Sequence, residues 1–330
     1  MRLLQILQIL VLLLMYAACS RSHSHAATPA NPVESQVKVS APFHFVAYGD
    51  ARFHDPRDTG AANPRARQEL VQAVAQATPA FIAFTGDLVY NGYDNNDWKV
   101  WDSETAVWRE KNIPVYPALG NHDLHGDEKV ALSNYFERFP DLNNCRYYSV
   151  RAANTLILVL DSSLREVAGA QGQWLAGKLD RLPGDVDFVF LVLHHPPYTS
   201  STDKMFSDGH SARSEERELA RMLEEREQTL RARIVVFSGH VHNYERHEHG
   251  GVTYLVTGGA GAHAYPIERA KDDPFQSKEI NYHYLNVEVG RGSVKITMRR
   301  LDLTSGKSVW SEPDSVTIVA PAARAVGQGR

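Results

Sequence analysis

The sequence predicts a layered α/β fold with a mixed sheet, and three observations support this. Short apolar runs alternate with helix-like segments through most of the chain, as in strands joined by helical crossovers. After about residue 242 only β-rich segments follow, so part of the sheet is expected to be antiparallel. Several apolar runs end in a residue with a hard oxygen or an imidazole, which predicts a site at the carboxyl edge of the sheet.

The composition suits one large hydrophobic core. The chain has 330 residues, 43% of them hydrophobic, which allows one large domain or at most two. The formal net charge is -4, so no basic excess would attract the whole chain to nucleic acid, and no nucleic-acid partner is expected. Charges are dense from Arg213 to Arg233, but their signs alternate at helical spacing, as on a solvated helix face.

Residues 1–19 have the shape of an export signal. Arg2 precedes a largely apolar stretch, residues 3–18, which is short for a bilayer span. Residues 16–19 (YAAC) resemble a bacterial lipoprotein cleavage box. Cleavage after residues 24–26 is a second interpretation, and a retained anchor is a third. The expected location is therefore the periplasm, the outer membrane as a lipoprotein, or the medium, with membrane contact only through such an anchor.

Three further regions follow this signal. Residues 20–41 are small, polar and proline-containing, so they are expected to form a flexible linker. Residues 42–302 form the predicted catalytic domain, and residues 303–330 a C-terminal strand, near 316–319, with a tail.

The elements of the predicted domain follow in order along the chain. The apolar runs expected as strands are Phe43–Tyr48, Phe81–Thr85, Val115–Leu119, Phe188–Leu193 and Ile234–Phe237. Helices are expected over Pro64–Ala77, with Asn63 as N-cap, and over Asp97–Glu110, Glu128–Phe139, Gln171–Leu182 and Ala212–Leu230. The later β-rich segments are Val252–Thr257, Tyr282–Val289 and Ser293–Leu301, with a hairpin turn at 290–292.

Five of these strands end in polar motifs. The motifs are Gly49-Asp50, Gly86-Asp87, Gly120-Asn121-His122-Asp123, His194-His195 and Gly239-His240-Val241-His242. In an extended segment residues i and i+2 share a face, so His240 and His242 could converge on one metal-sized volume. Carboxylate, amide oxygen and imidazole together suit hard to borderline divalent or trivalent cations. The motifs therefore predict a hydrolytic metal centre.

With these residues assembled, the sequence resembles the calcineurin-like metallophosphoesterase superfamily, and within it the purple acid phosphatase branch. The resemblance covers about Phe43 to Leu301, and the five motifs occur in the family's order. It implies a four-layer α/β/β/α fold with mixed central sheets and two metals bridged by Asp87. It assigns Asp50 and His242 to the first metal, and Asn121, His194 and His240 to the second.

One position departs from the wider superfamily. Two residues after the first aspartate, where a histidine ligand is usual, this chain has Arg52. The purple acid phosphatase branch also lacks that histidine and places a tyrosine three residues after the bridging aspartate, where this chain has Tyr90. A phenolate ligand would favour a trivalent ion, so the expected cofactors are Fe(III) together with Fe, Zn or Mn. The alternative is that Tyr90 is an aromatic residue in a loop and binds no metal.

Roles follow for the residues around the ligands. By resemblance, His122 protonates the leaving oxygen or stabilises transition-state charge, and Asp123 is a natural carboxylate to orient its imidazole. If the segment stays extended, His194 and His195 point to opposite faces, so His195 is expected to support the ligands or the fold and not to bind the cations directly. Candidates for contact with substrate are Arg52, His210, Arg246 and His263, although either arginine could instead brace the loops through a carboxylate. His247 and His249 are expected to be solvated.

The predicted function is an exported binuclear metal-dependent hydrolase of phosphate esters, an acid phosphatase-like phosphomonoesterase acting on a small phosphorylated substrate. A metal-bound hydroxide would attack phosphorus in line. The alternatives are a phosphodiesterase or nuclease of the same superfamily, and a catalytically inactive binding protein on the same scaffold.

Overall fold

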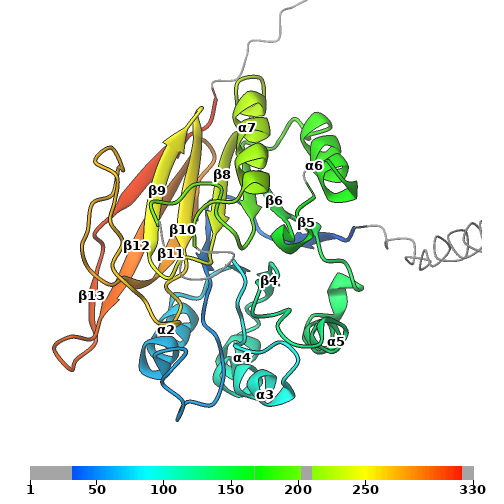
Figure 1. The fold of residues 1–330 in the computed structure, drawn as a ribbon. Helices are drawn as coiled ribbons and strands as arrows, with labels where there is room; N and C mark the ends of the chain where they lie inside the picture. Colours follow the sequence, from blue (N-terminus) through cyan, green and yellow to red (C-terminus); the bar gives the residue numbers. More distant parts are fainter. Residues whose placement is uncertain (1–31, 167, 202–209, 322–330) are drawn as a thin grey trace, which may run out of the picture.

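Two mixed sheets pack face to face, with helices on both outer sides (Figure 1). The computed structural model describes residues 32–166, 168–201 and 210–321. Each sheet has seven strands, and each contains parallel and antiparallel pairs. The predicted four-layer α/β/β/α fold is therefore confirmed.

The first sheet has its parallel strands at the centre. Its order is β1 (Glu34–Val37), β5 (Tyr148–Ala152), β6 (Thr155–Val159), β7 (Phe188–Val192), β8 (Arg233–Ser238), β10 (Val252–Thr257) and β9 (Tyr244–His249). Within it, the pairs β6–β7, β7–β8 and β8–β10 are parallel, and β9 pairs antiparallel with β10.

The second sheet combines a parallel and an antiparallel half. Its order is β13 (Val309–Ser311), β12 (Ser293–Asp302), β11 (Tyr282–Val289), β2 (Phe43–Tyr48), β3 (Ile82–Phe84) and β4 (Val115–Pro117), and β14 (Ser315–Val319) also pairs with β12. The strands β2, β3 and β4 run parallel, so their carboxyl ends lie at the same edge of the sheet.

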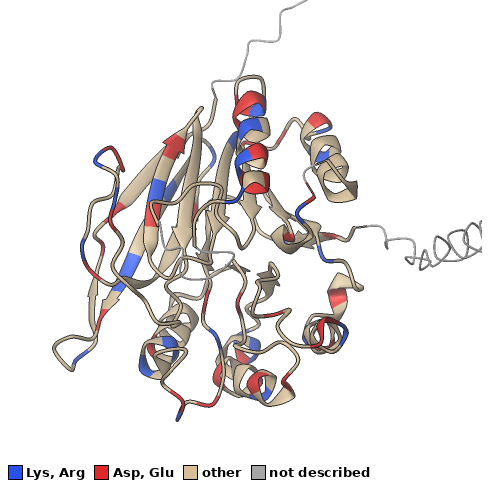
Figure 2. Cartoon of the chain, in the orientation of Figure 1, with Lys and Arg blue, Asp and Glu red and all other residues tan. Residues whose placement is uncertain are grey.

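Six helices cover the two sheets in the described part of the chain. They are α2 (Pro64–Ala77), α3 (Asn95–Glu104), α4 (Ala106–Glu110), α5 (Glu128–Arg138), α6 (Ala170–Asp180) and α7 (Ser214–Glu227). Leucines of α6 and α7 pack on β6 to β8, while α2, α3 and α4 pack on the second sheet. The solvated side of α7 carries both signs of charge, as its sequence predicted (Figure 2).

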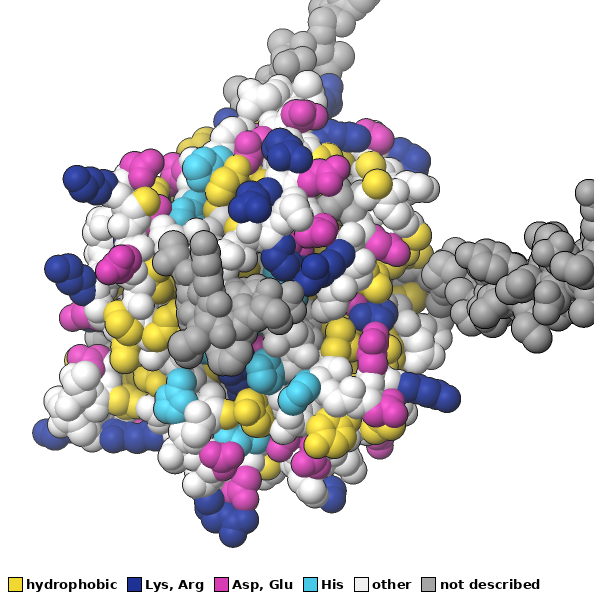
Figure 3. Space-filling model, viewed as in Figure 1, with side chains coloured by type: hydrophobic (Ala, Val, Ile, Leu, Met, Phe, Trp, Pro, Cys, Tyr) yellow, Lys and Arg dark blue, Asp and Glu magenta, His cyan; other side chains and the backbone are white. Residues whose placement is uncertain are grey.

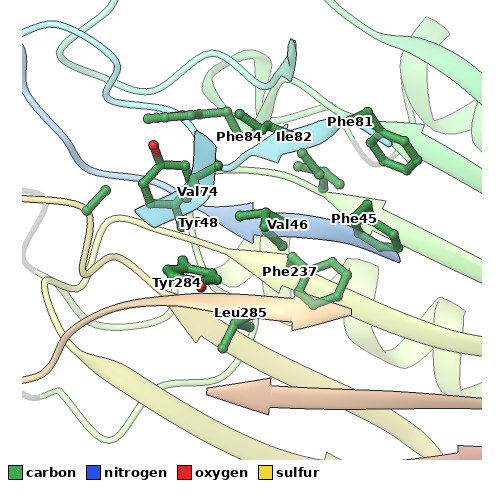
Figure 4. Packing of buried hydrophobic residues seen from close by; sticks show 14 of the residues in the cluster. Phe45, Val46, Tyr48, Val74, Phe81, Ile82, Phe84, Phe237, Tyr284 and Leu285 are labelled. Carbon is green, nitrogen blue, oxygen red and sulfur yellow. The ribbon is translucent and has the colours of Figure 1, made fainter. Parts of the chain in front are cut away.

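The core between the sheets is centred on stacked aromatic rings (Figure 4). Phe45 of β2 stacks on Phe81 with ring centroids 4.6 Å apart. The same ring meets Phe190 of β7 and Phe237 of β8 edge-on, at 5.1 and 6.1 Å. Phe45 therefore joins the two sheets whose strand ends carry the polar motifs.

Three local predictions differ from the structure. The expected linker includes β1, which pairs in parallel with β5, so residues 34–37 belong to the folded domain. The helix expected over Asp97–Glu110 is broken at Thr105, whose hydroxyl donates to the Trp101 carbonyl oxygen at 2.6 Å, giving α3 and α4. The C-terminal region holds β13 as well as the expected strand, here β14.

The predicted export signal and the linker up to residue 31 lie outside the described residues. Within the described ranges, no helix has both the length and the apolar character needed to cross a membrane.

Replacing Phe45 by alanine is expected to destabilise the fold by about 3–5 kcal/mol, because it removes a fully buried ring and leaves a cavity between the sheets. Urea unfolding followed by circular dichroism measures this cost. As a control, Val309→Ala removes a side chain that is half exposed and should change the free energy of unfolding by less than about 0.5 kcal/mol. Equal effects of the two substitutions would contradict this account of the core.

Candidate metal centre

The polar motifs meet because both sheets direct the carboxyl ends of parallel strands to one place. Asp50 follows β2, Asp87 follows β3 and Asn121 follows β4 in the second sheet. His194 follows β7 and His240 follows β8 in the first. The strands of each set are parallel neighbours, so the side chains come together from both halves of the fold.

Glycines before the ligands allow the loops to approach closely. A Cβ atom at Gly239 would lie 2.3 Å from Asp50 Oδ2, and one at Gly120 would lie 2.2 Å from Asp87 Oδ1. Any larger residue would therefore push directly against a predicted ligand carboxylate.

Three of the predicted ligands that follow a glycine adopt a rare backbone conformation. Asp50, Asp87 and His240 have φ angles of 64°, 53° and 70°. Residues other than glycine seldom occupy this left-handed region, and such strain is concentrated at functional sites. The turns aim each side chain inward from the end of its strand.

One group of predicted ligands consists of Asp50, Asp87 and His242, all buried, with ligand atoms within 4.8 Å of one another. His242 Nδ1 lies 2.9 Å from the carbonyl oxygen of His263. A carbonyl oxygen can only accept a hydrogen bond, so Nδ1 is the donor. In the neutral ring this leaves a lone pair on Nε2, a buried atom with no hydrogen-bond partner among the described residues. A buried lone pair beside two carboxylates fits a cation.

A second group contains three histidines, His194, His195 and His240, again with ligand atoms within 4.8 Å of one another. His194 Nδ1 donates to the Thr85 carbonyl oxygen at 2.9 Å, which leaves Nε2 as the ligand atom. The Asn121 side-chain oxygen lies 2.9 Å from His194 Nε2 and 3.1 Å from His240 Nδ1. These three groups converge on one point, as the donors of a cation do.

Asp87 lies between the two groups. Its Oδ1 is 3.4 Å from His194 Nε2 and accepts the backbone N–H of His122 at 2.9 Å. Burial alone would raise the pKa of Asp87, but its electrostatic interactions with His194, His122 and Arg52 lower it below its ordinary value. The pKa of Asp50 is raised by burial and by the nearby Asp87 carboxylate. Two buried carboxylates in contact with imidazole nitrogens would be stabilised by bound cations.

His122 is held beside this centre, though not by the predicted partner. Its Nδ1 donates to the Tyr90 carbonyl oxygen at 2.7 Å, and its ring stacks on that of Tyr90 at 5.2 Å. Burial lowers the pKa of His122 to about 4. The prediction that Asp123 orients His122 is wrong, since the Asp123 carboxylate accepts from the backbone of Val89 and Gly120 at 3.2 and 2.9 Å. Asp123 instead ties together the loops after β3 and β4.

The other predicted residues differ in how closely their side chains approach the centre. Arg52 Nη2 lies 3.2 Å from Asp87 Oδ2. His210 packs its ring against those of His240 and His242, at 5.0 and 5.7 Å. On the face in Figure 3, several histidine side chains gather below the middle of the molecule.

His263 contributes its carbonyl oxygen to His242, while its exposed ring is bonded to the Thr59 carbonyl oxygen. Tyr90 lies between His122 and His54, with ring centroids 5.2 and 5.4 Å away, and its role as a ligand stays a prediction. Arg246 lies on β9, where Asp314 and Glu248 bind its guanidinium. Its predicted contact with substrate is therefore not supported, and it braces the second sheet instead.

His195 packs against a predicted ligand. β7 ends at Val192, and the turn that follows brings the His195 ring to His240, with ring centroids 4.5 Å apart, a position compatible with the supporting role expected for it. His247 was expected to be solvated, but it is buried between Glu245 and Asp273. Tyr265, which packs against His242 at 5.6 Å, carried no signal in the sequence.

A family model described as calcineurin-like phosphoesterase matches residues 43–244, which include every predicted ligand. The chain belongs to this family. Over 203 residues it is 28% identical to a phosphoenolpyruvate phosphatase of Allium cepa. The aligned region covers 56% of this chain and 40% of the relative. The chain thus spans about two fifths of that relative's length.

Two further comparisons concern a bacterial relative and a solved structure. The chain is 24% identical over 232 residues to a probable cyclic nucleotide phosphodiesterase of Psychrobacter arcticus, covering 67% of this chain and 77% of the relative. Its fold is similar to that of the purple acid phosphatase PPD1 from yellow lupin (Lupinus luteus), with a TM-score of 0.63 at 16% identity, over 86% of this chain and 55% of that one. A purple acid phosphatase of Glycine max is 28% identical over 194 residues, covering 54% of this chain and 40% of the relative, and it supports the resemblance to the purple acid phosphatase branch.

Substituting Gly120 by alanine is expected to lower the metal content of purified protein by at least half, because the added methyl group would displace the Asp87 carboxylate. Inductively coupled plasma mass spectrometry after dialysis measures the metal per chain. The matched control is Gly292→Ala, where a Cβ meets nothing within 4 Å, and its metal content should equal that of wild type. Full metal content in folded Gly120→Ala protein would contradict the predicted ligand set.

Proposed function

We propose that the protein hydrolyses a small phosphate monoester at a centre of two cations bridged by Asp87. The observation that carries this proposal is the position of the Asp87 carboxylate. It belongs to the group with Asp50 and His242, and it also lies 3.4 Å from His194 Nε2 of the other group. A carboxylate shared in this way could hold two cations about 3.5–4 Å apart.

The residues supply the donors that such a centre needs. Asp50, Asp87 and His242 would hold one cation, and Asn121, His194 and His240 the other, with Asp87 shared. When bound, the cations would polarise the phosphoryl oxygens and activate the attacking water. Asn121 in the second set of donors is exposed, so a substrate could reach this half of the centre from solvent.

His122 is proposed as the group that exchanges a proton with the leaving oxygen. Its Nδ1 proton is committed to the Tyr90 carbonyl oxygen, so Nε2 is the ring atom that can hold and release a second proton. Its backbone N–H binds Asp87 Oδ1, which fixes the ring beside the bridging carboxylate. No serine or cysteine nucleophile is required by this scheme.

Asp87→Ala is expected to abolish hydrolysis of para-nitrophenyl phosphate, because both cations lose a shared ligand. His122→Ala should lower kcat by about 10²–10⁴-fold while metal content stays near that of wild type, since it removes only proton transfer or charge stabilisation. The control is His125→Ala, an exposed histidine of the same turn, with an expected change below about threefold. Wild-type turnover by Asp87→Ala protein would reject the proposal.

A phosphodiesterase is the second candidate, and the similarity to the Psychrobacter arcticus protein favours it. Turnover of bis(para-nitrophenyl) phosphate in preference to para-nitrophenyl phosphate by the same preparation would select it. Two bound metals with no turnover of either compound would instead indicate a binding protein on this scaffold.

We also propose that the Asp50 half of the centre takes Fe(III) with Tyr90 as an added ligand, and Fe, Zn or Mn in the other half. A phenolate is a hard anionic donor that suits a trivalent ion. Active protein loaded with iron should then show a visible tyrosinate-to-iron charge-transfer band, and Tyr90→Phe should lose it with the iron retained. A colourless active wild-type protein would remove Tyr90 from the ligand set.

A further inference from the structure

Arg52 places a positive charge inside the predicted centre. Its Nε and Nη2 lie 3.3 and 3.2 Å from one atom, Asp87 Oδ2. Only 13% of the Arg52 side chain is exposed, and Asp87 is fully buried. Such a pair is screened by water much less than a surface ion pair, so the charge of Arg52 acts strongly on its neighbours.

The charge of Arg52 extends over the whole Asp50, Asp87 and His242 group. The ligand atoms of these three side chains lie within 4.8 Å of one another, and the guanidinium lies 3.2 Å from one of them, Asp87 Oδ2. A divalent cation bound among them would therefore lie close to a positive charge and be repelled by it.

The backbone fixes Arg52 in this position. Its φ of 48° lies in the left-handed region, and its N–H donates to the Asp87 carbonyl oxygen at 3.0 Å. Its own carbonyl oxygen accepts from His54 Nδ1 at 2.6 Å and from Arg67 Nη1 at 3.2 Å.

Arg67 is itself fully buried and paired with Glu104 at 2.7 Å. Arg52 is therefore held by a buried network and is not a surface side chain that happens to lie nearby.

The two halves of the centre consequently differ in charge. Arg52 contacts Asp87 on Oδ2, whereas His194 faces Oδ1. The half formed by Asn121, His194 and His240 has neutral donors besides the shared carboxylate. The half formed by Asp50, Asp87 and His242 has the Asp50 carboxylate in addition, but Asp87 Oδ2 already accepts two hydrogen bonds from Arg52, which stands where the wider superfamily places a histidine ligand.

We propose that Arg52 competes with a divalent cation for the Asp50, Asp87 and His242 half, so that divalent cations fill the two halves unequally. The half formed by Asn121, His194 and His240 fills first, and the other fills only when a cation displaces the guanidinium from Asp87 Oδ2. This inference rests on the metal binding in the proposed function and is independent of catalysis.

Titration of metal-depleted protein with Mn²⁺, with free Mn²⁺ measured by electron paramagnetic resonance, gives the number of sites and their Kd values. Wild type should bind one Mn²⁺ at least 10-fold more tightly than the second. Arg52→Gln, which keeps a hydrogen-bond donor without the charge, should bring the second Kd to within about threefold of the first.

The matched control is Arg57→Gln, which removes the same charge from the same loop. The Arg57 side chain is 90% exposed and pairs with Asp55, so this variant should titrate like wild type. Arg52→Lys keeps the charge and should keep the second site at least about fivefold weaker than the first. If Arg52→Gln does not fold, Arg52→Met, similar in volume and uncharged, replaces it with the same expected result.

Equal Kd values in wild type, or an unchanged or weaker second site in Arg52→Gln, would overturn the inference. The same result for Arg52→Lys and Arg52→Gln would also overturn it, since the effect would not then follow the charge. Failure of the proposed function has a different outcome. Absence of any Mn²⁺ binding would reject both, whereas two unequal sites without phosphate-ester hydrolysis would reject the function alone.

Discussion

The site depends on the buried negative charge of Asp87. Its carboxylate is fully buried where the second sheet faces the end of the first, and it is contacted by Arg52, His194 and the backbone of His122. A buried carboxylate without such partners would strongly destabilise the fold. The loops after β2, β4 and β7 therefore have to approach Asp87, and this requirement determines where the other donors lie.

The close approach has a structural cost that the core offsets. Asp50, Asp87 and His240 adopt left-handed backbone conformations, each of which costs on the order of 1–3 kcal/mol. The aromatic contacts of Phe45 with Phe190 and Phe237 hold together the two sheets whose strands end in these turns. The rigid layered core can thus maintain strained loops at the site, and the arrangement of donors is fixed before any ligand binds.

Much of the fold and most of the candidate ligands could be predicted from local sequence. Apolar runs that end in glycine and a polar residue located Asp50, Asp87 and His240, because parallel strands bring such ends to one edge. The four layers followed from the family resemblance. Local patterns were sufficient here because each strand and its terminal residue are adjacent in the sequence.

The errors arose where the contacting residue is distant in the sequence, or where the alternation of side-chain faces stops because the strand has ended. Whether His122 is oriented by Asp123 or by the Tyr90 carbonyl oxygen depends on how two loops meet. The alternation of faces assumed for His194 and His195 holds only within a strand, and β7 ends before both residues. The partner of Arg246 is Asp314, 68 residues away, and short polar β1 carries no signal without its partner β5.

The central claim is that the two groups of donors hold two cations that share Asp87. Anomalous diffraction from crystals soaked in Mn²⁺ at a saturating concentration tests it most directly. The account predicts two peaks about 3.5–4 Å apart, one beside Asp50 and His242 and the other beside His194 and His240, with Asp87 in contact with both. A single peak that Asp87 does not touch, or no peak among these residues, would contradict it.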